Sequence, residues 1–247
     1  MNKLYNTYTL HDLSYLGLFR DKIIKRLKKK NKKFNGDLSL LHKYFSKKNI
    51  NTIRIDCFNE INFNLKWENI LKKIFFEELR KHLGSDIMVQ TKLNLSIQMP
   101  YDKSSVLSLH SDCWSADTPF QLNLWAPLTN AFKTNSMFIK DTSVTMNFIK
   151  TIKKNDKILK NIKPSVKDFV KVDYGQYLIF NPALLHGNVL NKTNKTRVSL
   201  NIRFKSFFSP EPGKRNPDRK FGTYYKIFNL SKNTKFGMRY LKTGMML

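Results

Sequence analysis

The chain has 247 residues and a mass of 29.2 kDa, enough for one large domain with its own core. It has only two cysteines, Cys57 and Cys113, which excludes a disulfide framework or a multi-cysteine zinc site as the basis of the fold. No apolar run approaches the roughly eighteen residues of a membrane span, and no signal-peptide pattern opens the chain. We therefore expect a cytoplasmic protein with no membrane partner.

The formal net charge is +27, from 45 basic and 18 acidic residues, and such an excess raises nucleic acid as a partner. The composition weakens this interpretation, because 36 lysines and 25 asparagines against nine arginines also fit a biased codon usage. The excess lies mainly in residues 1–50, with 13 basic and 3 acidic side chains, and in residues 203–247, with 11 and 2. No nucleic-acid-binding motif accompanies it, so nucleic acid stays open only as an alternative partner.

Apolar residues recur at helical spacing through much of residues 10–83. The clearest helix is WENILKKIFFEELRKHL, residues 67–83, with Gly84 positioned to end it. The run KIIKRLKKKNKK, residues 22–33, is typical of a helix with a solvated lysine face. We predict that residues 1–85 form a helical region packed on the rest of the protein.

After residue 84 apolar and polar residues alternate, which is typical of half-buried strands. The predicted strands are residues 92–99, 106–110, 121–128, 137–140, 169–172, 176–180, 184–189 and 198–208. Helices followed by short strands predict an α+β chain with a β-sandwich or jelly-roll core over residues 86–208 and the N-terminal helices packed on one sheet. A Lys-rich insertion is predicted at residues 142–165 and a basic C-terminal extension at residues 209–247.

Two of the five histidines lie in a context that suggests a metal site. His110 and Asp112 form a His-x-Asp motif at the end of a predicted strand, where side chains two residues apart point to the same face. His186 ends the apolar run YLIFNPALLH, and a return strand can bring it beside the pair. Two imidazoles and one carboxylate are the ligand set of non-haem Fe(II) oxygenases. The alternative is a solvent-facing strand end and a core histidine.

Arg197 opens the predicted strand RVSLNIRF and shares one face of it with Ser199, Asn201 and Arg203. A guanidinium that points into a β core is costly unless it meets an anion, and its planar fork fits the distal carboxylate of a dicarboxylic acid. The alternatives are a buried pairing with an aspartate of the chain, or a strand-end arginine that reaches water.

These residues resemble a known family, the Fe(II)/2-oxoglutarate-dependent dioxygenases, and in particular its phytanoyl-CoA dioxygenase-like branch. The resemblance covers residues 92–208 and rests on a set of spaced positions: His110-x-Asp112, His186-Gly187, Asn191, Thr193 and Arg197. Within it, the run LHSDCWSADTPFQLNLWAPLTNAFKTNSMFI is similar to small bacterial oxygenases of carbohydrate and streptomycin-type biosynthesis clusters.

The resemblance implies a double-stranded β-helix, a cupin-like jelly roll, and a role for each matching residue. Three residues would be the catalytic Fe(II) ligands: His110, Asp112 and His186. Arg197 would bind the co-substrate 2-oxoglutarate, with O2 as the oxidant, and Gln98 is positioned to help hold that co-substrate. Asn123 and Trp125, which share a face of LNLWAPL, are predicted to line the same site, or else to edge and cover the sheet.

We therefore expect an oxygenase that hydroxylates or otherwise oxidises a small polar metabolite. The favoured substrate is a sugar or sugar-derived intermediate of carbohydrate biosynthesis. The basic composition is compatible with an anionic substrate. The alternatives are an oxygenase of nucleic acid or a modified base, and a non-enzymatic basic binding protein with a jelly-roll core. The chain departs from the family pattern at Gln176, where Asp is common, and at Asn188, where Ser often follows His-Gly.

Overall fold

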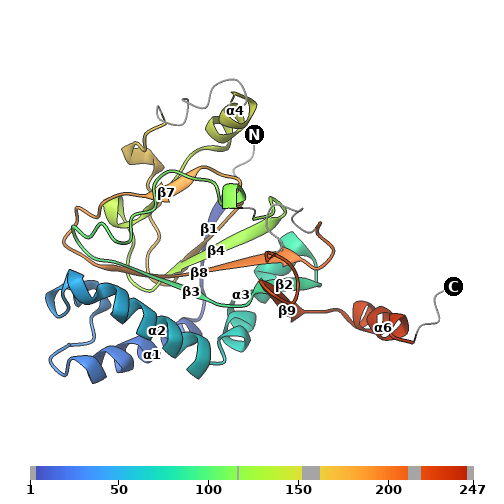
Figure 1. The fold of residues 1–247 in the computed structure, drawn as a ribbon, viewed down its shortest axis with the longest axis horizontal. Coiled ribbons are helices and arrows are strands. Elements are labelled where there is room, and N and C mark those ends of the chain that lie inside the picture. The colour runs from blue at the N-terminus through green and yellow to red at the C-terminus, as the bar shows by residue number, and fades with distance from the viewer. Residues whose placement is uncertain (1–3, 116, 152–161, 211–217, 244–247) are drawn as a thin grey trace.

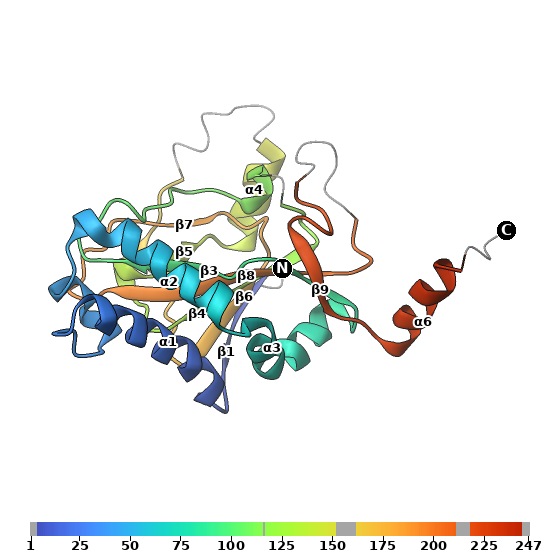
Figure 2. The same cartoon turned by 60° about the horizontal axis from the view of Figure 1, so that its bottom comes forward.

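The computed structural model describes residues 4–115, 117–151, 162–210 and 218–243 (Figure 1). Helices α1 (Ser14–Lys30), α2 (Ile50–Asn64) and α3 (Trp67–Leu83) pack along one face of an antiparallel sheet (Figure 2). The predicted α+β class is therefore confirmed. Among the described residues, no helix combines the length and the apolar character needed to cross a membrane.

The main sheet has seven strands in the order β1-β6-β4-β8-β2-β9, and β3 also pairs with β8. Every pairing is antiparallel. The strands are β1 (Tyr5–Thr9), β2 (Ile87–Gln90), β3 (Asn94–Gln98), β4 (Gln121–Pro127), β6 (Gln176–Phe180), β8 (Arg197–Ser206) and β9 (Tyr225–Asn229). The long strand β8 is the centre of the sheet, because it pairs with β4 on one side and with β2 and β3 on the other.

A second, smaller sheet lies on the side of the main sheet away from α1 and α2 (Figures 1 and 2). It consists of β5 (Met137–Ile139) and β7 (His186–Asn188), which pair antiparallel. Isolated bridges extend it, from His110 to His186 and from Phe138 to Phe169. The site discussed below lies between these two sheets.

Two clusters of buried apolar residues hold the layers together. The larger cluster joins α1, α2 and α3 to the main sheet, and α1 contributes Leu16, Phe19, Ile23 and Leu27 at helical spacing. The smaller cluster includes Trp125 of the main sheet and joins that sheet to β5. Both sheets that enclose the site are therefore held in place by tightly packed apolar side chains.

The remaining elements are short or peripheral. They are the 3-10 helices η1 (Leu38–Lys43), η2 (Lys47–Asn49), η3 (Asp112–Ser115), η4 (Lys133–Asn135) and η5 (Val166–Asp168), and the α-helices α4 (Thr142–Thr151) and α6 (Lys232–Leu241). Helix α4 lies in the predicted insertion, of which residues 152–161 are outside the described residues. Residues 211–217 and 244–247 of the predicted C-terminal extension are also outside them.

Three strands were not predicted and two predicted strands are wrong. Strand β2 is buried along its whole length, so it lacks the alternation that indicates a half-buried strand; β1 and β9 lie in segments where no alternation was identified. Residues 106–110 and 169–172 are extended but form only isolated bridges, because each meets a neighbouring strand at single positions.

Candidate metal centre and adjoining pocket

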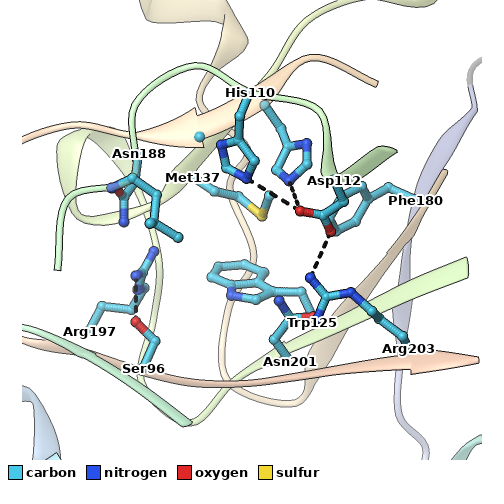
Figure 3. A pocket seen from close by; sticks show the side chains of 13 residues that line it. Ser96, His110, Asp112, Trp125, Met137, Phe180, Asn188, Arg197, Asn201 and Arg203 are labelled. Atoms are coloured by element: carbon cyan, nitrogen blue, oxygen red, sulfur yellow. Dashed lines mark hydrogen bonds and ion pairs between the residues drawn. The ribbon is translucent and has the colours of Figure 1, made fainter. Parts of the chain in front are cut away.

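Three predicted ligands converge in the structure: His110, Asp112 and the distant His186. Figure 3 labels His110 and Asp112 in the pocket that they line. A nitrogen of His110, a nitrogen of His186 and a carboxylate oxygen of Asp112 all lie within 4.8 Å of one another. The backbone N–H of each histidine donates to the carbonyl of the other, at 2.9 and 2.8 Å, so the two imidazoles stand side by side with ring centroids 4.4 Å apart. This bridge explains how residues 76 positions apart share one site.

Asp112 reaches this site by a different route from the one predicted. It does not continue a strand from His110 but begins η3, and its N–H donates to the carbonyl of Pro182 at 3.1 Å. The turn brings its Oδ1 to 3.4 Å from the Nε2 of His110 and to 3.7 Å from the Nε2 of His186. The expected strand was wrong, but the carboxylate still meets both imidazoles.

The hydrogen bonds of the two imidazoles leave their Nε2 atoms facing Asp112. The Nδ1 of His110 contacts the carbonyl of Ser108 at 2.7 Å, and the Nδ1 of His186 contacts that of Leu184 at 2.8 Å. A carbonyl only accepts, so each Nδ1 carries a proton, and in the neutral form of each ring the Nε2 lone pair faces the carboxylate. Outer carbonyls that fix the tautomer in this way are characteristic of metal-ligating histidines.

The pKa shifts of the group follow from burial and mutual charge. Burial lowers the pKa of His186 to about 4, which keeps this ring neutral at ordinary pH. Burial alone would lower the pKa of His110 as well, but hydrogen bonds with Asp112 and Ser108 raise it above its ordinary value. Burial opposes ionisation of Asp112, yet His110 and Arg203 hold its pKa well below the usual range. The site therefore keeps an ionised carboxylate between two imidazoles.

Arg197 lies across the pocket from this group, at the start of β8 (Figure 3). Its side chain is buried, one Nη2 hydrogen bond goes to the hydroxyl of Ser96 at 3.2 Å, and its Nε has no hydrogen-bond partner among the described residues. Burial and the nearby charge of Arg54 lower the pKa of Arg197 to about 10, which still leaves it charged. A buried guanidinium that is further destabilised by a second cation favours the binding of an anion.

A cavity of about 120 Å³ connects the metal-ligand group to Arg197. Its lining combines polar and apolar side chains: Ser96, Leu107, His110, Asp112, Trp125, Met137, Phe180, His186, Gly187, Asn188, Arg197, Asn201 and Arg203. The indole of Trp125 lies 5.6 Å from the guanidinium of Arg197, and the Oδ1 of Asn201 has no hydrogen-bond partner among the described residues. The cavity thus offers an acceptor, a cation and apolar walls to one small ligand.

Not every predicted co-substrate residue lines this cavity. Trp125 and Arg197 do, whereas Gln98 and Asn123 do not. Gln98 is fully buried on β3 and its Nε2 donates to the carbonyl of Val189 at 2.6 Å. Asn123 instead donates from its Nδ2 to the Oδ2 of Asp112 at 2.6 Å. The alternation of side chains predicted the face of β4 on which Asn123 lies, but it did not predict Asp112 as its hydrogen-bond partner.

Asn188, which departs from the family pattern, holds a loop of the pocket. Its Oδ1 accepts from the N–H of Leu107 at 2.5 Å, and its Nδ2 donates to the carbonyl of Ser105 at 3.0 Å. The loop that it holds leads directly to His110. An amide has both a donor and an acceptor, which lets this one side chain fix two backbone positions.

The sequence reasoning identified Arg203 as a residue on the face of Arg197 but not its contacts. The Nη2 of Arg203 lies 3.0 Å from the Oδ2 of Asp112, and its Nε lies 2.7 Å from the Oδ2 of Asp117. Asp117 was not singled out, because it lies in an irregular loop without periodicity. Arg197 and Arg203 are six residues apart on one strand, and this even spacing was the available sign that both side chains face the site.

Comparison with known proteins places this geometry in context. No protein-family model matches the sequence. Streptomycin biosynthesis protein StrG from Streptomyces griseus is 29% identical over 127 residues, which are 51% of this chain and 49% of that protein. The chain therefore matches about half the length of this curated relative.

Solved structures match over most of the chain. HygX from Streptomyces hygroscopicus, with nickel and 2-oxoglutarate bound, aligns with a TM-score of 0.52 and 14% identity over 92% of this chain and 94% of that one. The nickel complex of the non-heme monooxygenase ThoJ aligns with a TM-score of 0.50 and 14% identity, over 93% and 81%. The chain has the fold of the non-haem iron/2-oxoglutarate oxygenases, so the resemblance predicted from its sequence is confirmed.

Proposed function

We propose that this protein is an Fe(II)/2-oxoglutarate-dependent oxygenase that hydroxylates or otherwise oxidises a small polar metabolite. The observation that carries the proposal is the pairing, in one cavity, of the His110, Asp112 and His186 group with the buried guanidinium of Arg197. Either feature alone has structural explanations. Together they provide ligands for a metal and a counter-charge for an anionic co-substrate bound to that metal.

The donor set fits iron. Two imidazoles with inward Nε2 atoms and one ionised carboxylate form the two-histidine, one-carboxylate set that non-haem Fe(II) oxygenases use. The Nε2 of His186, which burial keeps neutral, turns its lone pair toward the carboxylate of Asp112, and a metal cation between them would stabilise this arrangement. We therefore assign the metal to His110, Asp112 and His186.

The pocket fits 2-oxoglutarate. Arg197 would hold the carboxylate remote from the metal, with the hydroxyl of Ser96 beside it, and the open hydrogen-bonding capacity of its Nε supports this role. Trp125, Met137 and Phe180 give the cavity apolar walls that exclude water from the reacting groups. When bound, Fe(II), 2-oxoglutarate and O2 supply the oxidation of an unactivated C–H bond, with release of succinate and CO2.

The arrangement of the two sheets supports a double-stranded β-helix. The metal ligands belong to β7 and to the segment bridged to it, whereas Arg197 belongs to β8 of the main sheet. A site between two facing sheets is where a cupin-like jelly roll holds its ligand. The small sheet has only β5 and β7 as strands among the described residues, and its isolated bridges extend it toward this architecture.

For the substrate we propose a sugar or sugar-derived intermediate, with the partial similarity to a streptomycin biosynthesis protein as support. A small anionic substrate also agrees with the net charge of +27. Under this proposal the partner is a small molecule rather than a nucleic acid.

An anaerobic titration with Fe(II) and then 2-oxoglutarate tests the chemistry, followed by a metabolite screen for succinate released only in the presence of substrate. We expect one Fe(II) per chain, and 2-oxoglutarate binding that depends on the metal. The matched control is a His110→Ala, His186→Ala double variant. Full metal content in that double variant would contradict the assignment.

A further inference from the structure

Two chains of polar contacts connect Asp112 with the segment from Arg219 to Tyr225, near the C-terminal end of the described residues. The first runs through Arg203 and Asp117, and the second through Asn123 and Gln121. Both end on Oδ2, the oxygen of Asp112 that does not face the imidazoles. The segment is more than 100 residues from Asp112 in the sequence.

The first chain consists of alternating charges. Arg203 donates to the Oδ2 of Asp112 at 3.0 Å and to the Oδ2 of Asp117 at 2.7 Å. Arg219 then donates to the Oδ1 of Asp117, and its guanidinium lies 4.2 Å from the ring centroid of Tyr224. The side chains of Arg203 and Asp117 are almost fully buried, so water does little to screen these contacts.

The second chain is a line of hydrogen bonds with one consistent direction. The hydroxyl of Tyr225 donates to the Oε1 of Gln121 at 2.5 Å, and the Nε2 of Gln121 donates to the Oδ1 of Asn123 at 3.2 Å. The Nδ2 of Asn123 donates to the Oδ2 of Asp112 at 2.6 Å. A carboxylate accepts only, so it fixes the orientation of Asn123, which in turn fixes that of Gln121.

Strand pairing explains why both chains reach the same atom. Asn123 of β4 and Arg203 of β8 are directly opposite in the antiparallel register, and both side chains point into the space between the sheets. Tyr225 begins β9 and lies opposite Gln90 of β2, whose Oε1 also contacts Arg203 at 3.3 Å. Residues of β9, β2 and β8 are thus in contact in sequence from Tyr225 through Gln90 and Arg203 to Asp112.

We propose that the Arg219–Tyr225 segment is a positioning element of the metal site, which acts through Arg203 and Asn123. Together these two side chains occupy Oδ2 of Asp112, so that Oδ1 alone faces His110 and His186. Arg203 and Tyr225 are positioning residues, because neither contacts the imidazoles. This inference rests on the proposed function, since it assumes that Asp112 is a metal ligand.

The test measures the affinity for Ni(II) in the presence of 2-oxoglutarate by calorimetry, on variants whose near-UV circular dichroism matches the wild type. Partners that orient a ligand typically change metal affinity about 10- to 100-fold, so Arg203→Lys should weaken Ni(II) binding by about tenfold or more. Tyr225→Phe removes one hydroxyl at the far end of a chain and should weaken it between about twofold and tenfold. Tyr177→Phe, which removes the hydroxyl of another buried tyrosine, on the helix side of the main sheet, is the matched control and should leave it unchanged.

A double-mutant cycle separates positioning from general structural support. In an Asn123→Ala background the hydrogen-bond chain is already broken, so Tyr225→Phe should have no further effect on Ni(II) affinity. The proposal would be overturned if Tyr225→Phe had the same effect on Ni(II) affinity with Asn123 as with Ala at position 123. It would also be overturned if Tyr225→Phe and Arg203→Lys each kept the wild-type affinity for Ni(II). Either result leaves the proposed function standing. If Arg203→Lys does not fold, the Tyr225→Phe cycle decides. Absence of Ni(II) binding by the wild type would instead overturn the proposed function, and this inference with it.

Discussion

The guanidinium of Arg197 donates a hydrogen bond of 3.2 Å to the hydroxyl of Ser96, and its Nε lacks a partner among the described residues. The two residues lie on neighbouring strands, β8 and β3, at the end of the cavity opposite the imidazoles. A neutral hydroxyl does not compensate a buried positive charge. In the proposed function, the pair would bind the carboxylate of 2-oxoglutarate that is remote from the metal.

Replacement of Arg197 should weaken the binding of 2-oxoglutarate far more than that of the metal. A buried charged contact is worth about 2 to 4 kcal/mol when truncated, so Arg197→Ala should raise the apparent constant for 2-oxoglutarate by about 30-fold or more. Arg197→Lys should restore only part of the loss, because an ammonium lacks the planar fork. Titration of both variants with 2-oxoglutarate and, separately, with Ni(II) checks this. Wild-type 2-oxoglutarate affinity in both variants would mean that another residue binds the carboxylate.

Gly187 should not tolerate a side chain, because the backbone before His110 passes close to it. A Cβ at this position would lie 2.7 Å from the carbonyl oxygen of Leu107, 2.8 Å from that of Ser108 and 2.9 Å from the ring of Phe138. We expect Gly187→Ala to push this segment away from His186 and to lower both thermal stability and Ni(II) affinity. Gly237→Ala on α6, where a Cβ meets nothing within 4 Å, is the control and should lose neither. Unchanged metal affinity in Gly187→Ala would show that the segment moves without consequence for the site.

Asp168 should contribute stability that is lost in acid. Burial alone would raise its pKa, but hydrogen bonds from Lys140 at 2.8 Å and from Ser165 lower it below the ordinary value. The unfolded chain therefore binds a proton more readily than the folded one, so this stability is present above about pH 3.9 and is lost as the pH falls through the lowered pKa.

Urea unfolding at a series of pH values checks the role of Asp168. At neutral pH, Asp168→Asn should reduce the free energy of unfolding by about 1 to 3 kcal/mol, because it leaves the buried ammonium of Lys140 without its counter-charge. The difference from the wild type should shrink in acid. Asp173→Asn, at a more exposed pair with Lys171, is the matched control. A difference that stays constant with pH would assign the effect to packing rather than to charge.

The salt dependence of turnover should distinguish a small substrate from a nucleic acid. A protein that contacts six or more phosphates loses about a thousandfold in affinity between about 50 and 200 mM salt, whereas a ligand with one or two charges loses far less. We expect a shallow dependence, with the net charge of +27 only moderately involved. Measurement of kcat/KM across this range decides, and a steep slope would favour the alternative that the substrate is a nucleic acid.

Residue types at fixed spacing carried most of the information about the site. His110, Asp112 and His186 were predicted together because ligand chemistry restricts the residues that can serve, and Arg197 because a charged residue on an inward strand face requires a partner. Contacts between side chains were not predictable in this way. Asn123 was predicted to line the site or to lie at the sheet edge; it donates to Asp112, and only the β4–β8 register shows that it lies opposite Arg203.

The fold was predictable where periodicity was strong. Helix α3 lies at the predicted residues 67–83, because its apolar stripe and terminal glycine agree. Strand β2 has no exposed face, and β9 pairs only with β2 among the described strands, so neither had a local sequence signal. Tyr225 and Arg219 were missed for this reason, since their importance depends on the position of β9.

The two ends of the strand path in the main sheet are β1 and β9, the first and the last of the described strands in sequence order. Tyr5 of β1 pairs opposite Phe180 of β6, so β1 must wait for most of the chain before it finds its partner, and β9 follows every other strand. Closing such long loops precedes any gain from strand contacts, which predicts slow folding of the sheet. A nascent chain that stops after β8 would contain all three imidazole and carboxylate ligands but not Tyr225. If the proposed function holds, full metal affinity would then be reached only after β9 has joined the sheet.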